Sequence, residues 1–201
     1  KSFSKANTNE NDEKLFNKLN FDLSKISQGQ CIIIINANET SIFEHVVFDN
    51  LRNCETELFN SEGSFNVYKS NIKMNYINFK NNRFGDDGIN FVNSTFDLKN
   101  IKLENIYSDG IDLDYSEGKI NNFSCTNCLN DGIDISNTTL HLENFNASKV
   151  DDKALSIGEL STFYGKDIKI NEAKIGLAVK DGSIALITNM IVEKSKFPIT
   201  T

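Results

Sequence analysis

Two acidic phrases repeat at a fixed distance in this chain. Asp109-Gly-Ile-Asp-Leu-Asp114 is followed 22 residues later by Asp131-Gly-Ile-Asp-Ile-Ser136. Carboxylates on one face of a protein can bind a hard cation such as Ca2+ or serve as the acid pair of glycoside hydrolysis. They can also accept hydrogen bonds from the backbone of a turn. The spacing therefore raises three hypotheses: a cation site, a catalytic cluster, and turn chemistry imposed by a repeating fold.

Each hypothesis assigns roles to particular residues. The predicted catalytic set is Asp109, Asp131 and Lys153, because a lysine beside paired carboxylates can abstract a proton. For Lys153 the alternative is a salt bridge at the end of the acidic column. Asp112, Asp114 and Asp134 are predicted to bind a ligand. The predicted metal ligands, for Ca2+ as the one expected cofactor, are Asp86, Asp87, Asp109 and Asp131.

A repeat of 22 residues organises the chain around these acids. Gly88, Gly110, Gly132, Ala154 and Gly176 are each 22 residues apart, with apolar residues one and three places later. Apolar and polar residues alternate in short runs within each unit, which is strand periodicity. Units of this length without the leucine-rich signature fit one coil of a parallel β-helix, in which equivalent apolar residues form internal ladders.

The sequence therefore predicts an all-β fold, a single-stranded parallel β-helix over residues 31–201, with its clearest coils at 65–195. A coil of 24 residues fits before Phe91, with two extra residues in the loop at 81–85. Register continues past Tyr164 only with a slip of one residue, and Tyr164 and Leu186 are assigned to an internal ladder.

Residues 1–30 are predicted to form an N-terminal cap region. Leu15, Phe16 and Leu19 have helical spacing and follow acidic residues, so a short amphipathic helix is expected within 12–21. Such a helix would cover the first coil, because solenoids need caps against edge pairing.

The repeat predicts that the acids form outward columns. Asp before Gly fits a corner with a left-handed glycine, where the carboxylate accepts local backbone hydrogen bonds. Stacked carboxylates about 5 Å apart repel one another. Solvent, backbone N–H donors, a lysine, raised pKa values or a bound cation must relieve this repulsion. The columns are Asp87, Asp109, Asp131 and Lys153 in one, and Asn90, Asp112, Asp134 and Ser156 in the other.

The four cysteines are predicted to be structural thiols. Cys125 and Cys128 occupy the columns of Leu103 and Ile106, so both are expected to point inward as small core residues. The alternative, a zinc site, needs a second pair of ligands beyond this C-x-x-C.

Three runs carry a resemblance to a known group. They are Asp-Gly-Ile-Asp-Ile-Ser at 131–136, Asp-Lys-Ala-Leu-Ser-Ile-Gly-Glu at 152–159, and Ile-Gly-Leu-Ala-Val-Lys-Asp-Gly-Ser at 175–183. Over roughly residues 85–195 the chain resembles uncharacterised bacterial right-handed parallel β-helix proteins of the pectate-lyase-like superfold. The resemblance implies a right-handed coil and carries no assigned chemistry.

The same superfold includes polygalacturonases, and two of their active-site motifs resemble Gly85-Asp86-Asp87 and Ser108-Asp109-Gly110. The coil that should carry Gly-His-Gly reads Asp152-Lys153-Ala154, and Arg-Ile-Lys is absent from the sequence. This departure counts against hydrolase activity, because a fold alone does not determine function.

The bulk composition limits the possible partners. A net charge of −7 argues against nucleic acid, and no apolar run approaches the length of a membrane span. The leading hypothesis is a non-catalytic, extracellular or cell-surface module with a structural or carbohydrate-contacting role and a surface-exposed acidic face that binds Ca2+. One alternative is a polysaccharide-active lyase, epimerase or glycosidase. The other is a fibre subunit that stacks on copies of itself through its end coils.

Overall fold

The computed structural model describes residues 20–22, 30–55 and 60–201, and all regular structure in these ranges is β-strand. The predicted helix within 12–21 lies outside the described residues except for Asn20 and Phe21, which belong to a strand. The strands are β1 (Asn20–Asp22), β2 (Ile32–Ile35), β3 (Ser41–Asp49), β4 (Gly63–Tyr68), β5 (Asn71–Lys80), β6 (Asp87–Val92), β7 (Thr95–Ile106), β8 (Asp109–Asp114), β9 (Glu117–Cys128), β10 (Ile133–Ser136), β11 (Thr139–Gly158), β12 (Thr162–Val179), β13 (Ile184–Glu193) and β14 (Phe197–Thr200).

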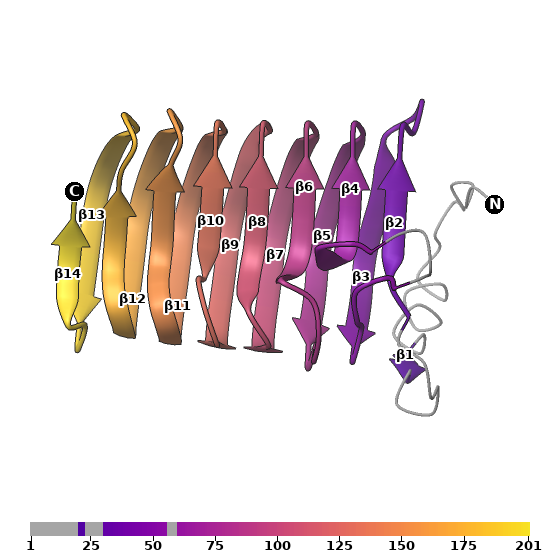
Figure 1. The fold of residues 1–201 in the computed structure, drawn as a ribbon, viewed down its shortest axis with the longest axis horizontal. Coiled ribbons are helices and arrows are strands. Elements are labelled where there is room, and N and C mark those ends of the chain that lie inside the picture. The colour runs from indigo at the N-terminus through magenta and orange to yellow at the C-terminus, as the bar shows by residue number, and fades with distance from the viewer. Residues whose placement is uncertain (1–19, 23–29, 56–59) are drawn as a thin grey trace, which may run out of the picture.

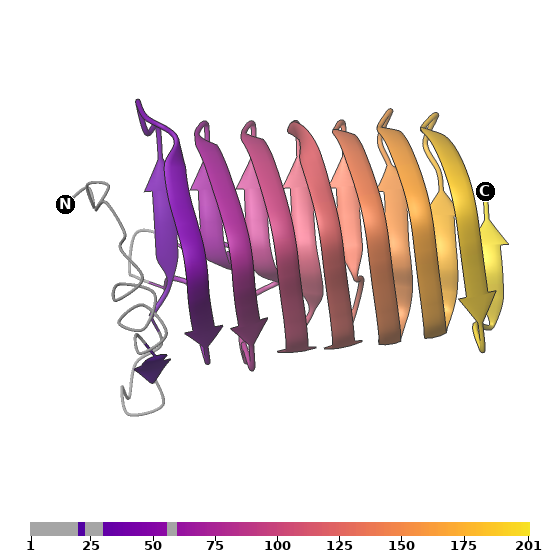
Figure 2. The ribbon, with the colours of Figure 1, turned by 180° about the vertical axis from the view of Figure 1, so that it is seen from behind.

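The strands form one 14-stranded parallel sheet wound into a right-handed solenoid, as predicted (Figure 1). Strands β2, β4, β6, β8 and β10 run along one side, and β3, β5, β7 and β9 run in the opposite direction along the other (Figure 2). The long strands β11 and β12 continue around a corner and contribute to both sides. None of the described residues forms a helix that could cross a membrane.

The register between coils follows the predicted repeat through the middle of the chain. Asp87 pairs with Asp109, and Ile111 pairs with Ile133, each 22 residues apart. The 24-residue coil is also confirmed, because Phe65 pairs with Ile89. The pairing keeps this longer offset at Lys80 and has lost it by Asp87, so the two extra residues lie between them, in the expected loop.

The predicted position of the later slip was wrong. Thr162 already pairs with Thr139, so the additional residue enters before β12, at the left-handed residues Glu159 and Leu160. Tyr164 consequently pairs with His141 and points outward, as does Leu186. Moving a strand by one residue exchanges its inner and outer faces, and an aromatic residue in the expected column concealed the change.

The interior consists of apolar ladders, one rung per coil. Ile89, Ile111, Ile133 and Leu155 stack directly on one another and are fully buried. Phe123 and Phe145 stack face to face with centroids 5.5 Å apart. Burying each such side chain stabilises the fold by about 1.5–3 kcal/mol, so the ladders hold the coils together.

Among the described residues, asparagine is the commonest residue at the left-handed corners, and glycine is rare there. Asn100, Asn122 and Asn144 have φ of 53°, 59° and 58° at equivalent positions of three coils. The amide of Asn122 donates to Asn100 Oδ1 at 2.6 Å, so the corner residues also bond to one another along the stack. Asparagine tolerates the left-handed region better than other residues with a Cβ, and this explains its abundance.

The glycine of the repeated Asp-Gly is needed for space and not for a left-handed conformation, which corrects our expectation. A Cβ on Gly110 would point into the core, 3.4 Å from Cys125 Sγ, and would collide with the carbonyl oxygen of Gly132 in the next coil. Only a residue without a side chain allows the stacked backbones to approach this closely.

The cysteines are paired, which corrects the prediction of free thiols. Cys125 and Cys128 are fully buried in their predicted columns, but they form a disulfide with each other. The left-handed corner at Asn127 turns the chain so that both side chains face inward, with Cα atoms 6.7 Å apart. Cys31 and Cys54 form a second disulfide across the first coil.

A column of buried hydroxyl groups, which we did not predict, follows the strands of one side. The Oγ of Ser116 accepts a hydrogen bond from Ser94 N at 3.0 Å and donates to the carbonyl oxygen of Asp114 at 2.7 Å. Ser116 N in turn donates to the Oγ1 of Thr138 at 3.0 Å. Each hydroxyl therefore satisfies a buried backbone N–H of the preceding coil, which would otherwise be unpaired.

Replacing Ser116 by alanine should destabilise the protein by about 1–3 kcal/mol, because Ser94 N loses its buried acceptor. The measurement is the free energy of unfolding in urea. Ser124→Ala, on the outer face of β9, is the matched control and should change it by less than about 0.5 kcal/mol. Equal losses for the two variants would contradict the role of the hydroxyl column.

Candidate functional site

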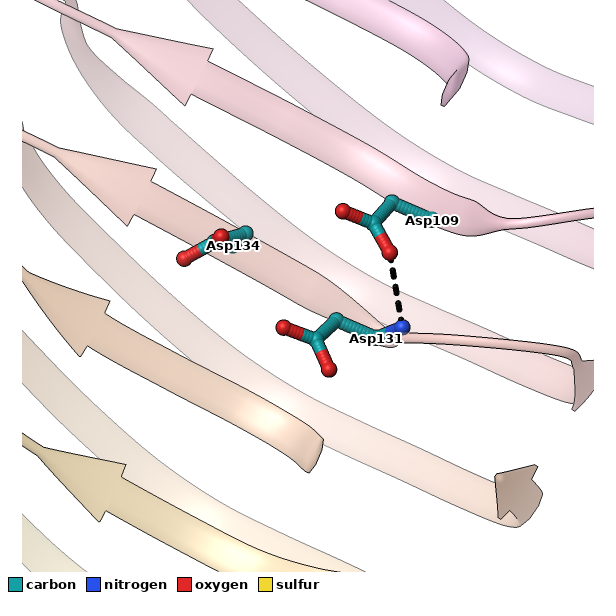
Figure 3. A group of neighbouring side chains, drawn as sticks. All are labelled: Asp109, Asp131 and Asp134. Carbon is teal, nitrogen blue, oxygen red and sulfur yellow. Dashed lines mark hydrogen bonds between the residues drawn. The ribbon is translucent and has the colours of Figure 1, made fainter. Parts of the chain in front are cut away.

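The acidic site is formed where β8 and β10 begin. Asp109 opens β8, Asp131 lies just before β10, and Asp134 lies within it. Oxygen atoms of these three carboxylates all lie within 4.8 Å of one another, on the same side of the sheet (Figure 3). Carboxylates from two consecutive coils thus converge on one point.

A break in strand alternation places Asp109 and Asp112 on the same side, although they are three residues apart. Gly110 faces the core, and Ile111 after it is fully buried in its ladder. With two inward residues in succession, the acids before and after them both point outward. The same sequence of residues in the next coil places Asp131 with Asp134.

Backbone hydrogen bonds link the acids along the column. Asp109 Oδ1 accepts a hydrogen bond from Asp131 N at 2.8 Å and one from Asn130 Nδ2 at 2.6 Å. Asp131 Oδ1 accepts one from Lys153 N at 2.8 Å. The turn chemistry that we predicted is therefore present, and it fixes one oxygen of each of these two carboxylates.

Lys153 closes the column by salt bridges, which was the alternative to a catalytic role. Its Nζ lies 3.0 Å from Asp131 Oδ2 and 2.5 Å from Asp152 Oδ2. Burial lowers the pKa of Lys153, but the hydrogen bonds to Asp152 and Asp131 outweigh it and leave that pKa raised. These salt bridges favour the protonated form of Lys153, and a protonated lysine cannot accept a proton.

The acids of the first column are buried and those of the second, Asp112 and Asp134, are half-buried, whereas we expected an exposed face. Asp87 is 3% exposed, Asp109 8% and Asp131 2%. Side chains at the coil spacing cover one another, because every carboxylate in the column has a neighbour directly above or below it. The charges of these stacked acids, which we call the acidic cluster, therefore interact in poorly solvated surroundings, where repulsion is stronger than in water.

Burial and mutual repulsion raise the pKa values in the acidic cluster. Burial, followed by the charges of Asp112 and Asp109, raises the pKa of Asp87 to about 9. Burial and Asp114 raise the pKa of Asp112 to about 8. The pKa of Asp109 rises only to about 7, because the N–H of Asp131 and the amide of Asn130 partly offset its burial. Near neutral pH the carboxyl groups of the acidic cluster therefore hold protons, and a bound cation would displace them.

Two polar atoms beside the acids have no hydrogen-bond partner among the described residues. They are Asn90 Oδ1 and Ser156 Oγ, and both residues are fully buried. Asn90 pairs with Asp112 in the register between coils, and Ser156 pairs with Asp134, so these residues bracket the carboxylates of one column. Most buried polar atoms in proteins bond to another protein group, an ordered water or an ion.

The structure brings together some of the predicted ligands and separates others. Asp109 and Asp131, predicted for a metal, converge with Asp134, predicted for another ligand. The metal candidates Asp86 and Asp87 lie one coil away, outside this group. Asp112 lies next to Asp134 in the same column, and Asp114 lies two residues further along β8.

Sequence reasoning missed Glu62, whose charge contributes to the raised pKa values of Asp87, Asp112 and Asp114. Its Oε2 accepts a hydrogen bond from Asn90 Nδ2 at 2.9 Å. Extending the 24-residue coil by one residue aligns Glu62 with Asp86, so the signal was present in the repeat.

No family model, curated protein or solved structure matches this chain. The chemistry of the acidic cluster therefore follows from its own geometry. That geometry consists of three converging carboxylates, a column of buried acids and two unpaired polar atoms.

The raised pKa values predict that stability decreases as pH rises. These carboxyls bind protons in the folded state at pH values where the unfolded chain, with a pKa near 3.8, has released them. The free energy of unfolding should therefore be highest near pH 4 and decrease up to about pH 9. In a buffer with chelator, it should be lower by at least about 2 kcal/mol at about pH 9 than at about pH 5.

Asp87→Asn should reduce this difference, because the amide resembles the protonated acid and has no charge to bury. Asp181→Asn replaces an exposed acid and serves as the control, with the difference unchanged. A wild-type free energy of unfolding that rises between about pH 5 and about pH 9 would exclude the proposed electrostatics of the acidic cluster.

Proposed function

We propose that this chain is a non-catalytic β-solenoid module that binds Ca2+ in its acidic cluster. The observation that carries the proposal is the convergence of Asp109, Asp131 and Asp134, whose carboxylate oxygens lie within 4.8 Å of one another. Hard cations take oxygen ligands, and Ca2+ accepts the irregular geometries that a stack of strands provides. A divalent ion would also offset the repulsion between the buried acids.

The unpaired atoms support the proposal independently of the charges. Asn90 Oδ1 and Ser156 Oγ are both oxygen atoms, the ligand type that Ca2+ uses, and both lie in the column of Asp112 and Asp134. A cation with bound water would provide these buried oxygens with a partner.

A cell-surface or extracellular location is part of the proposal, and the disulfides support it. Cys31–Cys54 and Cys125–Cys128 together use all four cysteines of the chain. Disulfides persist mainly in oxidising compartments, and millimolar Ca2+ is available outside cells to a site of modest affinity.

Contact with a polysaccharide is the further function that we propose for this face. Tyr107 and Tyr115 lie on either side of the acidic strand Asp109–Asp114 and are 53% and 62% exposed. Exposed tyrosines combine a flat apolar ring with a hydroxyl group and are common in recognition surfaces. With carboxyls between them, we expect the two rings to flank a sugar chain that lies across β8.

Millimolar Ca2+ should raise the melting temperature relative to chelator, because ligand that binds only the folded state stabilises it. The rise should be larger at about pH 8 than at about pH 5.5, since Ca2+ competes with protons for the carboxylates. Differential scanning calorimetry at both pH values measures the effect.

Asp134→Asn should remove most of the rise, because it changes one of the three converging ligands and keeps the side-chain shape. Asp97→Asn, on the opposite side of the solenoid beside Lys119, is the matched control and should retain it. A wild-type melting temperature that does not respond to Ca2+ at either pH would refute the cation site.

A further inference from the structure

An open groove crosses the side of the solenoid formed by β5, β7, β9 and the start of β11, which faces the viewer in Figure 2. The acidic cluster lies on the other side, on the row of strands that includes β8 and β10. The groove has a volume of about 640 Å3, within the range of about 300–1,000 Å3 that is usual for ligand sites. It runs across the strands, so successive coils contribute to it in turn.

The first wall of the groove is an outward column of polar side chains. It consists of Asn71, Thr95, Glu117 and Thr139, one from each successive coil, and all of them are exposed. The hydroxyl of Thr95 donates to Asn71 Oδ1 at 2.5 Å. Amide, hydroxyl and carboxylate groups thus offer a ligand along this wall both donors and acceptors.

The second wall is the outward column two residues further along each strand. It consists of Lys73, Asp97, Lys119 and His141. Asp97 Oδ2 lies 3.4 Å from Lys119 Nζ, whereas Asp97 Oδ1 is buried and has no hydrogen-bond partner among the described residues. Most buried polar atoms bond to a protein group, a water or an ion, and a hydroxyl donor in the groove would supply a partner for this oxygen.

The floor between the two walls is apolar. Ile72 and Phe96 belong to it, and Gly118 continues their column in the next coil. A Cβ on Gly118 would collide with the ring and the carbonyl oxygen of Phe96, so a residue without a side chain is needed for the ring to lie here. The floor offers apolar contact to the carbon atoms of a ligand whose polar groups bind the walls.

Two stacked rings stand at one end of the groove. The ring of His141, the last residue of the second wall, stacks on that of Tyr164 in the next coil, with centroids 4.5 Å apart and planes 9° apart. Tyr164 therefore covers one face of the imidazole. The other face is turned toward the coil of Lys119, which carries the groove.

We propose that this groove binds a neutral polysaccharide that lies along the solenoid axis. Neighbouring coils are about 4.8 Å apart, close to the length of one sugar residue in an extended chain, so equivalent wall positions meet successive sugars. Sugar hydroxyls both donate and accept hydrogen bonds, as the mixed walls require. The C–H face of a sugar ring packs on the apolar floor and on the free face of His141.

The charges favour a neutral chain over an acidic one. The groove is lined by two lysines, Lys73 and Lys119, and by two acids, Asp97 and Glu117. These charges balance, so they give no net attraction for carboxylates, and the net charge of −7 repels an acidic polymer. The site is separate from the contact proposed around Tyr115, and it depends neither on that contact nor on Ca2+.

Native gel electrophoresis in chelator, with a polysaccharide cast into the gel, tests the proposal. The neutral probes are hydroxyethyl cellulose, galactomannan and arabinoxylan, and polygalacturonate is the acidic comparison. At least one neutral polymer should retard the wild-type chain, and more strongly than polygalacturonate does. Asp97→Ala should raise the dissociation constant for that polymer at least about tenfold, because a charged acceptor is lost.

Glu104→Ala is the matched control. Glu104 lies on the same strand as Asp97 and also forms a salt bridge, with Lys102 at 2.9 Å, but it does not line the groove. This variant should keep the affinity of the wild type. Circular dichroism should show unchanged folding in both variants, because surface substitutions of this kind change stability little.

Several results would overturn the proposal. Retardation by none of the neutral polymers, or stronger retardation by polygalacturonate, would exclude a neutral chain as the ligand. Binding that survives Asp97→Ala, or that is lost equally in Glu104→Ala, would place the contact outside the groove. Loss in Tyr115→Ala alone would refute the groove and support the contact proposed on the acidic side, so the two proposals fail separately.

Discussion

Parallel hydrogen bonds between successive coils hold each residue over its counterpart in the next coil, and most other features depend on this register. Ile111 lies over Ile133, and Asn122 donates to Asn100, because the coil length is constant. Each position therefore has to suit its own neighbours and also the same position above and below it. Apolar positions respond with ladders, left-handed corners with asparagines, and tight backbone contacts with glycines.

The same constraint concentrates charge. Once Asp109 and Asp131 occupy one column, they cannot move apart without breaking the strands that carry them. Backbone N–H groups satisfy one oxygen of each, and Lys153 neutralises one end of the column. Asp87 and Asp112 form no salt bridge with a described lysine or arginine, and their pKa values of about 9 and 8 express the remaining cost of burying them. Proton uptake and cation binding are alternative ways to relieve that cost, which explains why we place the binding site here.

The register could be predicted because it is written as a period in the sequence. Ile89 and its equivalents identified the ladders, and the extra residues of the 24-residue coil were placed correctly. The slip before β12 could not be located, because Tyr164 is apolar enough to fit either face. Disulfide formation at Cys125 and Cys128 depends on the backbone corner between them, and a column assignment alone does not show that corner.

The candidate site was only partly predictable. The columns of acids followed from the repeat, but their burial did not, because alternation alone says which side a residue faces and not how deeply it lies. The break at Gly110 and Ile111, which places Asp109 beside Asp112, involves two consecutive inward residues, and a strict period of two does not predict it. Asn90 and Ser156 looked like ordinary polar positions until their unpaired oxygens were seen.

Removing one whole coil tests the central claim most directly, that the register of 22 residues specifies this fold. Deletion of residues 89–110 joins Gly88 to Ile111 and leaves every column aligned, whereas deletion of 89–109 shifts each later residue by one position. Far-ultraviolet circular dichroism during thermal unfolding should show a cooperative β-sheet transition for the first variant and its loss for the second. If the whole-coil deletion unfolds as completely as the shifted one, the register does not specify the structure as argued.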